Sequence, residues 1–158
     1  MAHDHADRAK ALFESGYNCA QAVFCAFGDV TGLDTDTAAR IASSFGGGLA
    51  RMREVCGAVS GAAMVLGMVF GYSDKGATEA KRAHYHLIQD FAAAFRGEKG
   101  SIICRELLAG SAVMPGKDPE KRTPEYYKRR PCPDMVWYAA YLVDCVLNGE
   151  RLGVDKQN

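Results

Sequence analysis

Residues 55–71 read VCGAVSGAAMVLGMVFG, and no charged side chain interrupts them. Within this run glycine recurs at Gly57 and Gly61 and again at Gly67 and Gly71, in two pairs whose members are four residues apart. Residues four apart share one face of an α-helix, so each pair forms a small notch that lets another helix approach closely. The run therefore predicts a buried central helix with two glycine notches.

The same apolar run has a second interpretation as a membrane span. With 17 residues, it reaches only the lower limit for crossing a bilayer. The chain begins with the polar residues MAHDHADR, which lack the apolar segment of a secretory signal peptide. We therefore expect a soluble protein of the reducing cytoplasm, with no membrane span.

Length and composition suit one domain covering residues 1–158. The chain is 48% apolar and 24% charged, which is enough for a hydrophobic core without disulfide bonds. Its 19 basic side chains balance its 19 acidic ones, so the formal net charge is zero. Such a chain does not attract phosphate backbones as a whole, which argues against nucleic acid as a partner.

Local signals divide the rest of the chain into further helices. Asn18 followed by Gln21 resembles a capping box that starts a helix at Cys19. The other expected helices span residues 4–16 after a cap at Asp4, a segment after a cap at Asp34 or Thr35, 78–96, 101–108 after a cap at Ser101, and 132–148. Residues 111–130 contain three prolines and are expected to be irregular. Together these signals predict an all-α fold, a compact bundle of about five to six helices around the buried Gly/Ala-rich central helix.

Four of the six cysteines fall at expected helix starts. They are Cys19, Cys56, Cys104 and Cys132. Unpaired backbone N–H groups and the positive end of the helix dipole stabilise a thiolate at such a position and lower its pKa. These four residues are therefore the candidate redox-active or metal-ligating thiols. Cys25 and Cys145 fall inside helices and are interpreted as core residues.

Basic residues lie near two of these cysteines. A triple-glycine bend at residues 46–48 precedes Cys56, and Arg51 and Arg53 between them are expected to tune the charge state of its thiol. The run Lys128–Arg130 precedes the last candidate cysteine and is interpreted as a solvated stretch that raises the local positive potential.

The spacing of the cysteines matches no local metal-binding signature. The gaps between the four candidates are long, and the chain contains no C-x-x-C motif. His84 and His86 lie two residues apart and do not face each other on a helix, and no role is assigned to His3 or His5. A metal site built from four separate helix starts stays open, because ligands need only converge in space.

Five sequence segments together resemble a known family. They are YNCAQAV at residues 17–23, FGGG followed by RM at 45–52, CGAVSG at 56–61, CRELLAG at 104–110, and CP at 132–133. The chain resembles, over nearly its whole length, the bacterial and archaeal redox-active protein family that four cysteines and a CGAxxG motif define. The resemblance implies a redox role without a specified reaction, and it matches the family's cysteines to Cys19, Cys56, Cys104 and Cys132.

Two interpretations of these cysteines stay open. In the first, the chain is a thiol–disulfide oxidoreductase with Cys56 as the attacking thiol and an unidentified redox partner. In the second, the same four cysteines hold an iron–sulfur cluster or another thiophilic metal. The small-residue face from Gly57 to Gly71 suits packing within a monomer or across a homodimer, so the oligomeric state also stays open.

Overall fold

A computed structural model describes residues 3–111, 113 and 116–153, and it confirms the all-α fold class. Within these residues, six helices have eight or more residues: α1 (Asp4–Glu14), α2 (Cys19–Ala26), α4 (Thr35–Ala42), α6 (Gly57–Phe70), α7 (Thr78–Lys99) and α10 (Cys132–Leu147). The short elements are α3 (Gly28–Thr31), the 3₁₀ turn Ser43–Phe45, α5 (Gly46–Leu49), α8 (Cys104–Leu107) and α9 (Pro124–Arg129). No helix in the described part of the chain is both long and apolar enough to cross a membrane.

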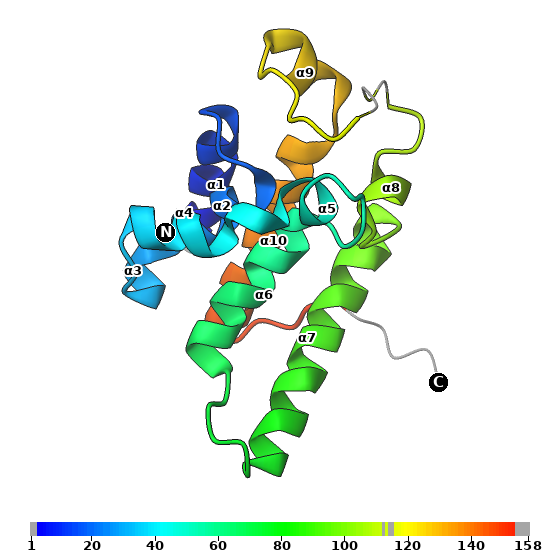
Figure 1. The fold of residues 1–158 in the computed structure, drawn as a ribbon. Helices are drawn as coiled ribbons and strands as arrows, with labels where there is room; N and C mark the ends of the chain where they lie inside the picture. The colour runs from blue at the N-terminus through cyan, green and yellow to red at the C-terminus, as the bar shows by residue number, and fades with distance from the viewer. Residues whose placement is uncertain (1–2, 112, 114–115, 154–158) are drawn as a thin grey trace.

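The helices pack around α2 and α6. Helix α6 contacts α2, α10 and α7, while α1 packs against α10 and α2. Phenylalanine rings fill much of the space between them and are fully or almost fully buried: Phe13, Phe24, Phe27, Phe91 and Phe95. Figure 1 shows α5, α8 and α9 gathered at the end of the bundle where α6 and α10 begin. This end carries the candidate site.

The first glycine notch of α6 is confirmed. A Cβ atom added to Gly57 would lie 2.3 Å from Cys19 Sγ, and one added to Gly61 would lie 2.6 Å from the Ala20 carbonyl oxygen. Real Cβ atoms do not approach other atoms that closely, so α6 and the start of α2 touch only because both positions are glycine. The central helix is therefore pressed against the segment that carries the first candidate cysteine.

The prediction of a second glycine notch, at Gly67 and Gly71, is wrong. A Cβ at Gly67 would meet no atom of another segment within 4 Å, and Gly71 follows the helix in extended backbone instead of packing against a neighbour. The last turn of α6 is open, with Met68 51% and Phe70 44% exposed. The central helix is thus buried at the end near the candidate site and exposed at the other.

Two of the expected helix caps are confirmed. The Asn18 side chain accepts a hydrogen bond from the Gln21 backbone N–H at 2.8 Å, and the Gln21 side chain accepts one from the Asn18 N–H, which completes the capping box of α2. Asp34 likewise accepts from the Thr37 N–H at 2.9 Å and caps α4. These caps are local and depend on residues three apart, which is why the sequence predicts them.

Three expectations about the helix starts and loops are wrong. Asp4 is the first residue of α1 and not its cap. Ser101 does not cap α8, because its hydroxyl accepts from the Ile103 N–H at 2.9 Å before the helix begins. The segment expected to be irregular contains α9, which begins at Pro124. Proline suits the first position of a helix, because the N–H group that it lacks would have no partner within the helix there.

The two unlike glycines of α6 give a matched test of the packing. Gly61→Ala is expected to lower the free energy of unfolding by about 1–3 kcal/mol, because the new methyl group has no space against α2. Gly67→Ala on the same helix is expected to raise it by about 0.5–1 kcal/mol, because alanine favours the helix and meets nothing. Chemical denaturation measures both, and equal effects of the two substitutions would contradict the packing described above.

Candidate functional site

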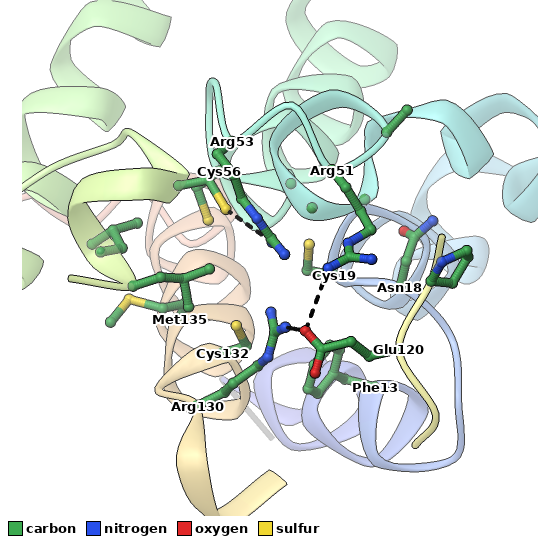
Figure 2. A pocket seen from close by; sticks show the side chains of 18 of the residues that line it. Phe13, Asn18, Cys19, Arg51, Arg53, Cys56, Glu120, Arg130, Cys132 and Met135 are labelled. Atoms are coloured by element: carbon green, nitrogen blue, oxygen red, sulfur yellow. Dashed lines mark hydrogen bonds and ion pairs between the residues drawn. The ribbon is translucent and has the colours of Figure 1, made fainter. Parts of the chain in front are cut away.

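All four candidate cysteines lie at helix starts. Cys19, Cys104 and Cys132 are the first residues of α2, α8 and α10, and Cys56 directly precedes α6. Cys132 is therefore inside its helix and does not occupy the cap position, which Pro131 holds. The four side chains line one pocket of about 330 Å³. Figure 2 shows Cys19, Cys56 and Cys132 around this pocket.

The pocket cysteines are not joined by disulfide bonds in the structure and differ in exposure. All six cysteines of the chain are described, and each is a free thiol. Cys56 and Cys104 are 7% and 8% exposed, whereas Cys19 and Cys132 are half-buried and lie open to the pocket. All four line the pocket, so a small molecule there meets side chains of each of them.

Backbone hydrogen bonds join the segment that leads into Cys56 to the segment that leads into Cys104. The Cys56 N–H donates to the Ile102 carbonyl at 2.8 Å, and the Cys104 N–H donates to the Glu54 carbonyl at 2.6 Å. A single antiparallel bridge between Val55 and Ile103 lies in the middle of this contact. The two cysteines, 48 positions apart in the sequence, thus begin their helices from one shared strip of extended backbone.

The triple-glycine bend continues as an unusual left-handed path. Gly47 and Gly48 have positive φ, and so do the non-glycine residues Leu49, Ala50, Arg51 and Arg53. Positive φ costs energy in residues with a Cβ and tends to concentrate at functional sites. Backbone bonds hold the path in place, including Arg53 N–H to Gly47 O at 3.1 Å and Glu54 N–H to Gly48 O at 2.8 Å. The sequence predicts the bend at the glycines but not its extension through the arginines.

The left-handed path brings Arg51 and Arg53 to the pocket, as Figure 2 shows. Arg53 Nη1 donates to Cys104 Sγ at 3.7 Å, so its guanidinium group stabilises negative charge on that sulfur. The sequence predicts an effect of these arginines on Cys56, whereas the hydrogen bond goes to Cys104. Gly48 permits this contact, since a Cβ there would lie 2.6 Å from Cys104 Cβ.

Further charged residues of the pocket come from the segment before α10. Arg130 is 8% exposed and contacts Glu120, so it is not part of a solvated run as expected from Lys128–Arg130. Arg51 lies 3.5 Å from the same Glu120 carboxylate. The sequence does not predict Glu120 and Arg122 as pocket residues, because nothing in an apparently irregular segment indicates which side chains fold back over a distant pocket.

Burial dominates the charge state of three of the pocket thiols. It raises the pKa of Cys19, Cys56 and Cys132, that of Cys132 from 9.0 to about 12. Each of these pKa values is raised further by at least one neighbouring pocket cysteine and lowered only in part by nearby N–H groups or by Arg130. The expectation that helix starts lower these pKa values is therefore wrong, because loss of water outweighs the helix dipole.

The remaining cysteines and histidines lie outside the pocket. Cys25 and Cys145 are buried within α2 and α10, in agreement with the core interpretation, and neither lines the pocket. His84 also lies elsewhere, with its ring 6.3 Å from that of Tyr72.

The raised pKa of Cys132 predicts a specific pH dependence. Alkylation requires the thiolate, so labelling of Cys132 by iodoacetamide is expected to increase about tenfold per pH unit up to at least pH 10. Peptide mass spectrometry measures the labelled fraction, and the chain unfolded in guanidinium is the control with an ordinary thiol. A plateau below pH 9 in the folded protein would show that burial does not control this thiol.

Comparison with known proteins identifies the family of the chain. A family model described as "Putative redox-active protein (C_GCAxxG_C_C)" matches residues 17–146, a range that includes all four pocket cysteines. The searches of curated proteins and of solved structures found no match. Because the matched range covers far more than half of the 158 residues, the chain belongs to this redox-active protein family.

Proposed function

We propose that the four-cysteine pocket carries out thiol–disulfide exchange. The observation that supports this most strongly is the convergence of four free thiols, from four separate helix starts, on one pocket. The charge on one pocket thiolate raises the pKa of its neighbours, for example Cys19 acting on Cys56 and on Cys132. The four sulfurs therefore share one electrostatic environment, which supports a joint role in exchange.

Cys104 is the attacking thiol in this proposal, in place of Cys56. Burial and neighbouring cysteines keep Cys56 protonated by raising its pKa, and a protonated thiol is a poor nucleophile. Cys104 accepts a hydrogen bond from Arg53, whose guanidinium group is placed to stabilise the negative charge of an attacking sulfur. The other three cysteines then supply the second, resolving thiol.

The proposed reaction transfers two electrons. The Cys104 thiolate attacks one sulfur of a disulfide reactant, whose S–S bond breaks and releases one thiolate. A second pocket thiol loses its proton and attacks Cys104 Sγ, which releases the other half of the reactant. The protein ends as a disulfide, and the reactant, with the two protons, ends as two thiols.

The role of Cys104 predicts a clear mutational result. Reduced protein mixed with 2-hydroxyethyl disulfide is expected to lose two thiols and about 2 Da in mass, reversibly with dithiothreitol. Cys104→Ser is expected to slow the first step at least about tenfold, because the attacking sulfur beside Arg53 is gone. Thiol counting and intact mass follow the reaction.

Cys25→Ser is the matched control, since Cys25 is buried in α2 but lies outside the pocket, and its rate should equal that of the parent protein. An unchanged rate in Cys104→Ser would contradict the assignment of the attacking thiol. Failure of the parent protein to form any disulfide would contradict the proposed function itself.

The alternative function is a site for an iron–sulfur cluster or thiophilic metal. A single tetrahedral ion bound at about 2.3 Å requires sulfurs about 3.8 Å apart. Among the described residues, the pocket cysteines do not form a group of three ligand atoms within 4.8 Å of one another, so the arrangement does not fit one ion. A cluster spaces its thiolates more widely and suits four sulfurs. Iron and sulfide in anaerobically purified protein, with visible absorption lost in Cys104→Ser, would favour this alternative over exchange.

A further inference from the structure

The pocket lining carries a surplus of positive charge. Five basic residues line it: Arg51, Arg53, Lys117, Arg122 and Arg130. Among the lining residues, Glu120 is the one carboxylate, and it pairs with Arg51 and with Arg130. Because burial raises the pKa of Cys19, Cys56 and Cys132, these thiols do not supply balancing negative charge at neutral pH.

Arg122 is the pocket arginine whose contacts best suit the binding of a ligand. Its Nη2 donates to the Tyr17 carbonyl at 3.2 Å, and its guanidinium group lies 4.5 Å from the Phe13 ring and 4.7 Å from the Tyr126 ring. Its Nη1 is buried and has no hydrogen-bond partner. A buried donor without a partner costs free energy, which an anionic group in the pocket would recover.

We propose that the reactant of this pocket is a small disulfide that carries a negatively charged group such as a carboxylate. The carboxylate binds Arg122 while a sulfur of the reactant meets Cys104 beside Arg53. This inference rests on the proposed exchange function, and the bonds that form and break are those given above. The pocket volume of about 330 Å³ lies at the lower end of the range for small-molecule sites.

Three disulfides of nearly equal size but different charge test the inference. They are 3,3'-dithiodipropionate (anionic), 2-hydroxyethyl disulfide (neutral) and cystamine (cationic). Each rate of thiol loss is divided by the rate of the unfolded chain with the same reagent. The anionic disulfide is expected to react about tenfold or more faster than the neutral one, and the cationic one slowest, at low salt. Added salt should reduce these differences because it screens charge.

Arg122→Gln should reduce the anionic preference, whereas Arg82→Gln, on the exposed face of α7, should preserve it. The salt dependence of the parent protein gives an answer even if Arg122→Gln does not fold. Equal relative rates for all three reagents would overturn the anionic reactant and leave the exchange function intact. No reaction with any of them would overturn the exchange function.

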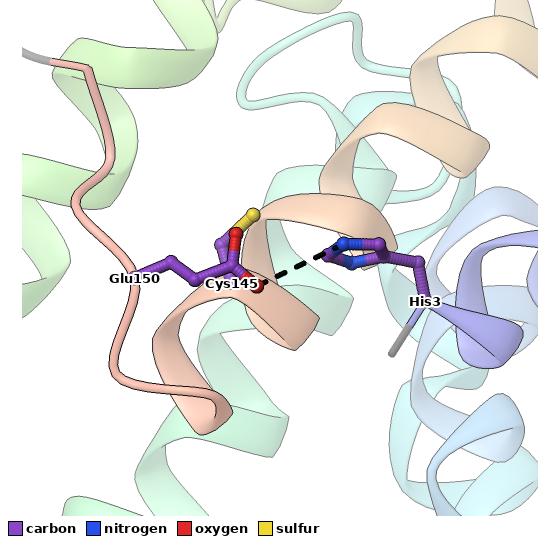
Figure 3. Close-up of side chains that lie close together, drawn as sticks. All are labelled: His3, Cys145 and Glu150. Carbon is purple, nitrogen blue, oxygen red and sulfur yellow. Dashed lines mark ion pairs between the residues drawn. The ribbon is translucent and has the colours of Figure 1, made fainter. Parts of the chain in front are cut away.

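A second, independent inference concerns the other end of α10. Figure 3 shows the side chains of His3, Cys145 and Glu150 directed toward one another. His3 directly precedes α1, Cys145 lies within α10, and Glu150 follows α10. Their ligand atoms all lie within 4.8 Å of one another, with His3 Nε2 3.8 Å from Glu150 Oε1. His3 Nδ1 is buried without a hydrogen-bond partner, and Cys145 is only 4% exposed.

We infer that these three residues bind a divalent transition metal such as zinc. An imidazole nitrogen, a thiolate and a carboxylate oxygen are all zinc ligands, and three protein ligands leave a fourth position for water. Binding would release the thiol proton of Cys145 to solvent. The ion would join the start of α1 to the end of α10, two helices that already pack together.

Cobalt(II) replaces zinc in such sites and reports thiolate ligation by its visible and near-ultraviolet absorption. One equivalent of cobalt is expected to give a thiolate charge-transfer band that His3→Ala and Cys145→Ser abolish. Cys104→Ser and His86→Ala, which leave His3, Cys145 and Glu150 unchanged, should retain the band. A band that is lost in Cys104→Ser but kept in Cys145→Ser would place the metal in the cysteine pocket and overturn this inference, as would no binding.

Discussion

The close contact between α6 and the start of α2 is the constraint on which the site depends. At Gly57 the backbone of α6 lies where a Cβ would be 2.3 Å from Cys19 Sγ, and at Gly61 it approaches the Ala20 carbonyl equally tightly. This contact sets the distance between the first two candidate cysteines. Gly61 lies inside α6, where glycine is destabilising, so its use there indicates that proximity matters more at this position than helix stability.

A second contact completes the pocket from the opposite side. The left-handed path after the triple glycine places Arg53 against Cys104 and lines up the Val55–Ile103 bridge. Non-glycine residues in this conformation carry a backbone cost that the surrounding hydrogen bonds must offset. The pocket therefore depends on two backbone features, the glycine notch of α6 and the left-handed bend after the triple glycine. Each brings cysteines from distant parts of the chain to the same pocket.

These features explain which parts of the protein the sequence predicts. Caps at Asn18 and Asp34 depend on partners three residues away, and the helix-start positions of the four cysteines follow from equally local signals. Gly61 and Gly67 look alike in the sequence but differ in the fold, because only tertiary packing decides which one faces a neighbour. Arg122 and Glu120 fold over the pocket for the same non-local reason, and no spacing pattern reveals them.

The pKa values of the thiols show how a local rule and a tertiary effect compete. Backbone N–H groups at the helix starts do lower the pKa of Cys19 and Cys56, as the dipole argument requires, but burial raises it by more. The pocket consequently combines three thiols of raised pKa with a surplus of arginines. In the proposed exchange, negative charge passes from the attacking Cys104 sulfur to the sulfur that leaves when the S–S bond of the reactant breaks. The arginines then stabilise the charge that forms during reaction, which is where electrostatic stabilisation accelerates a chemical step.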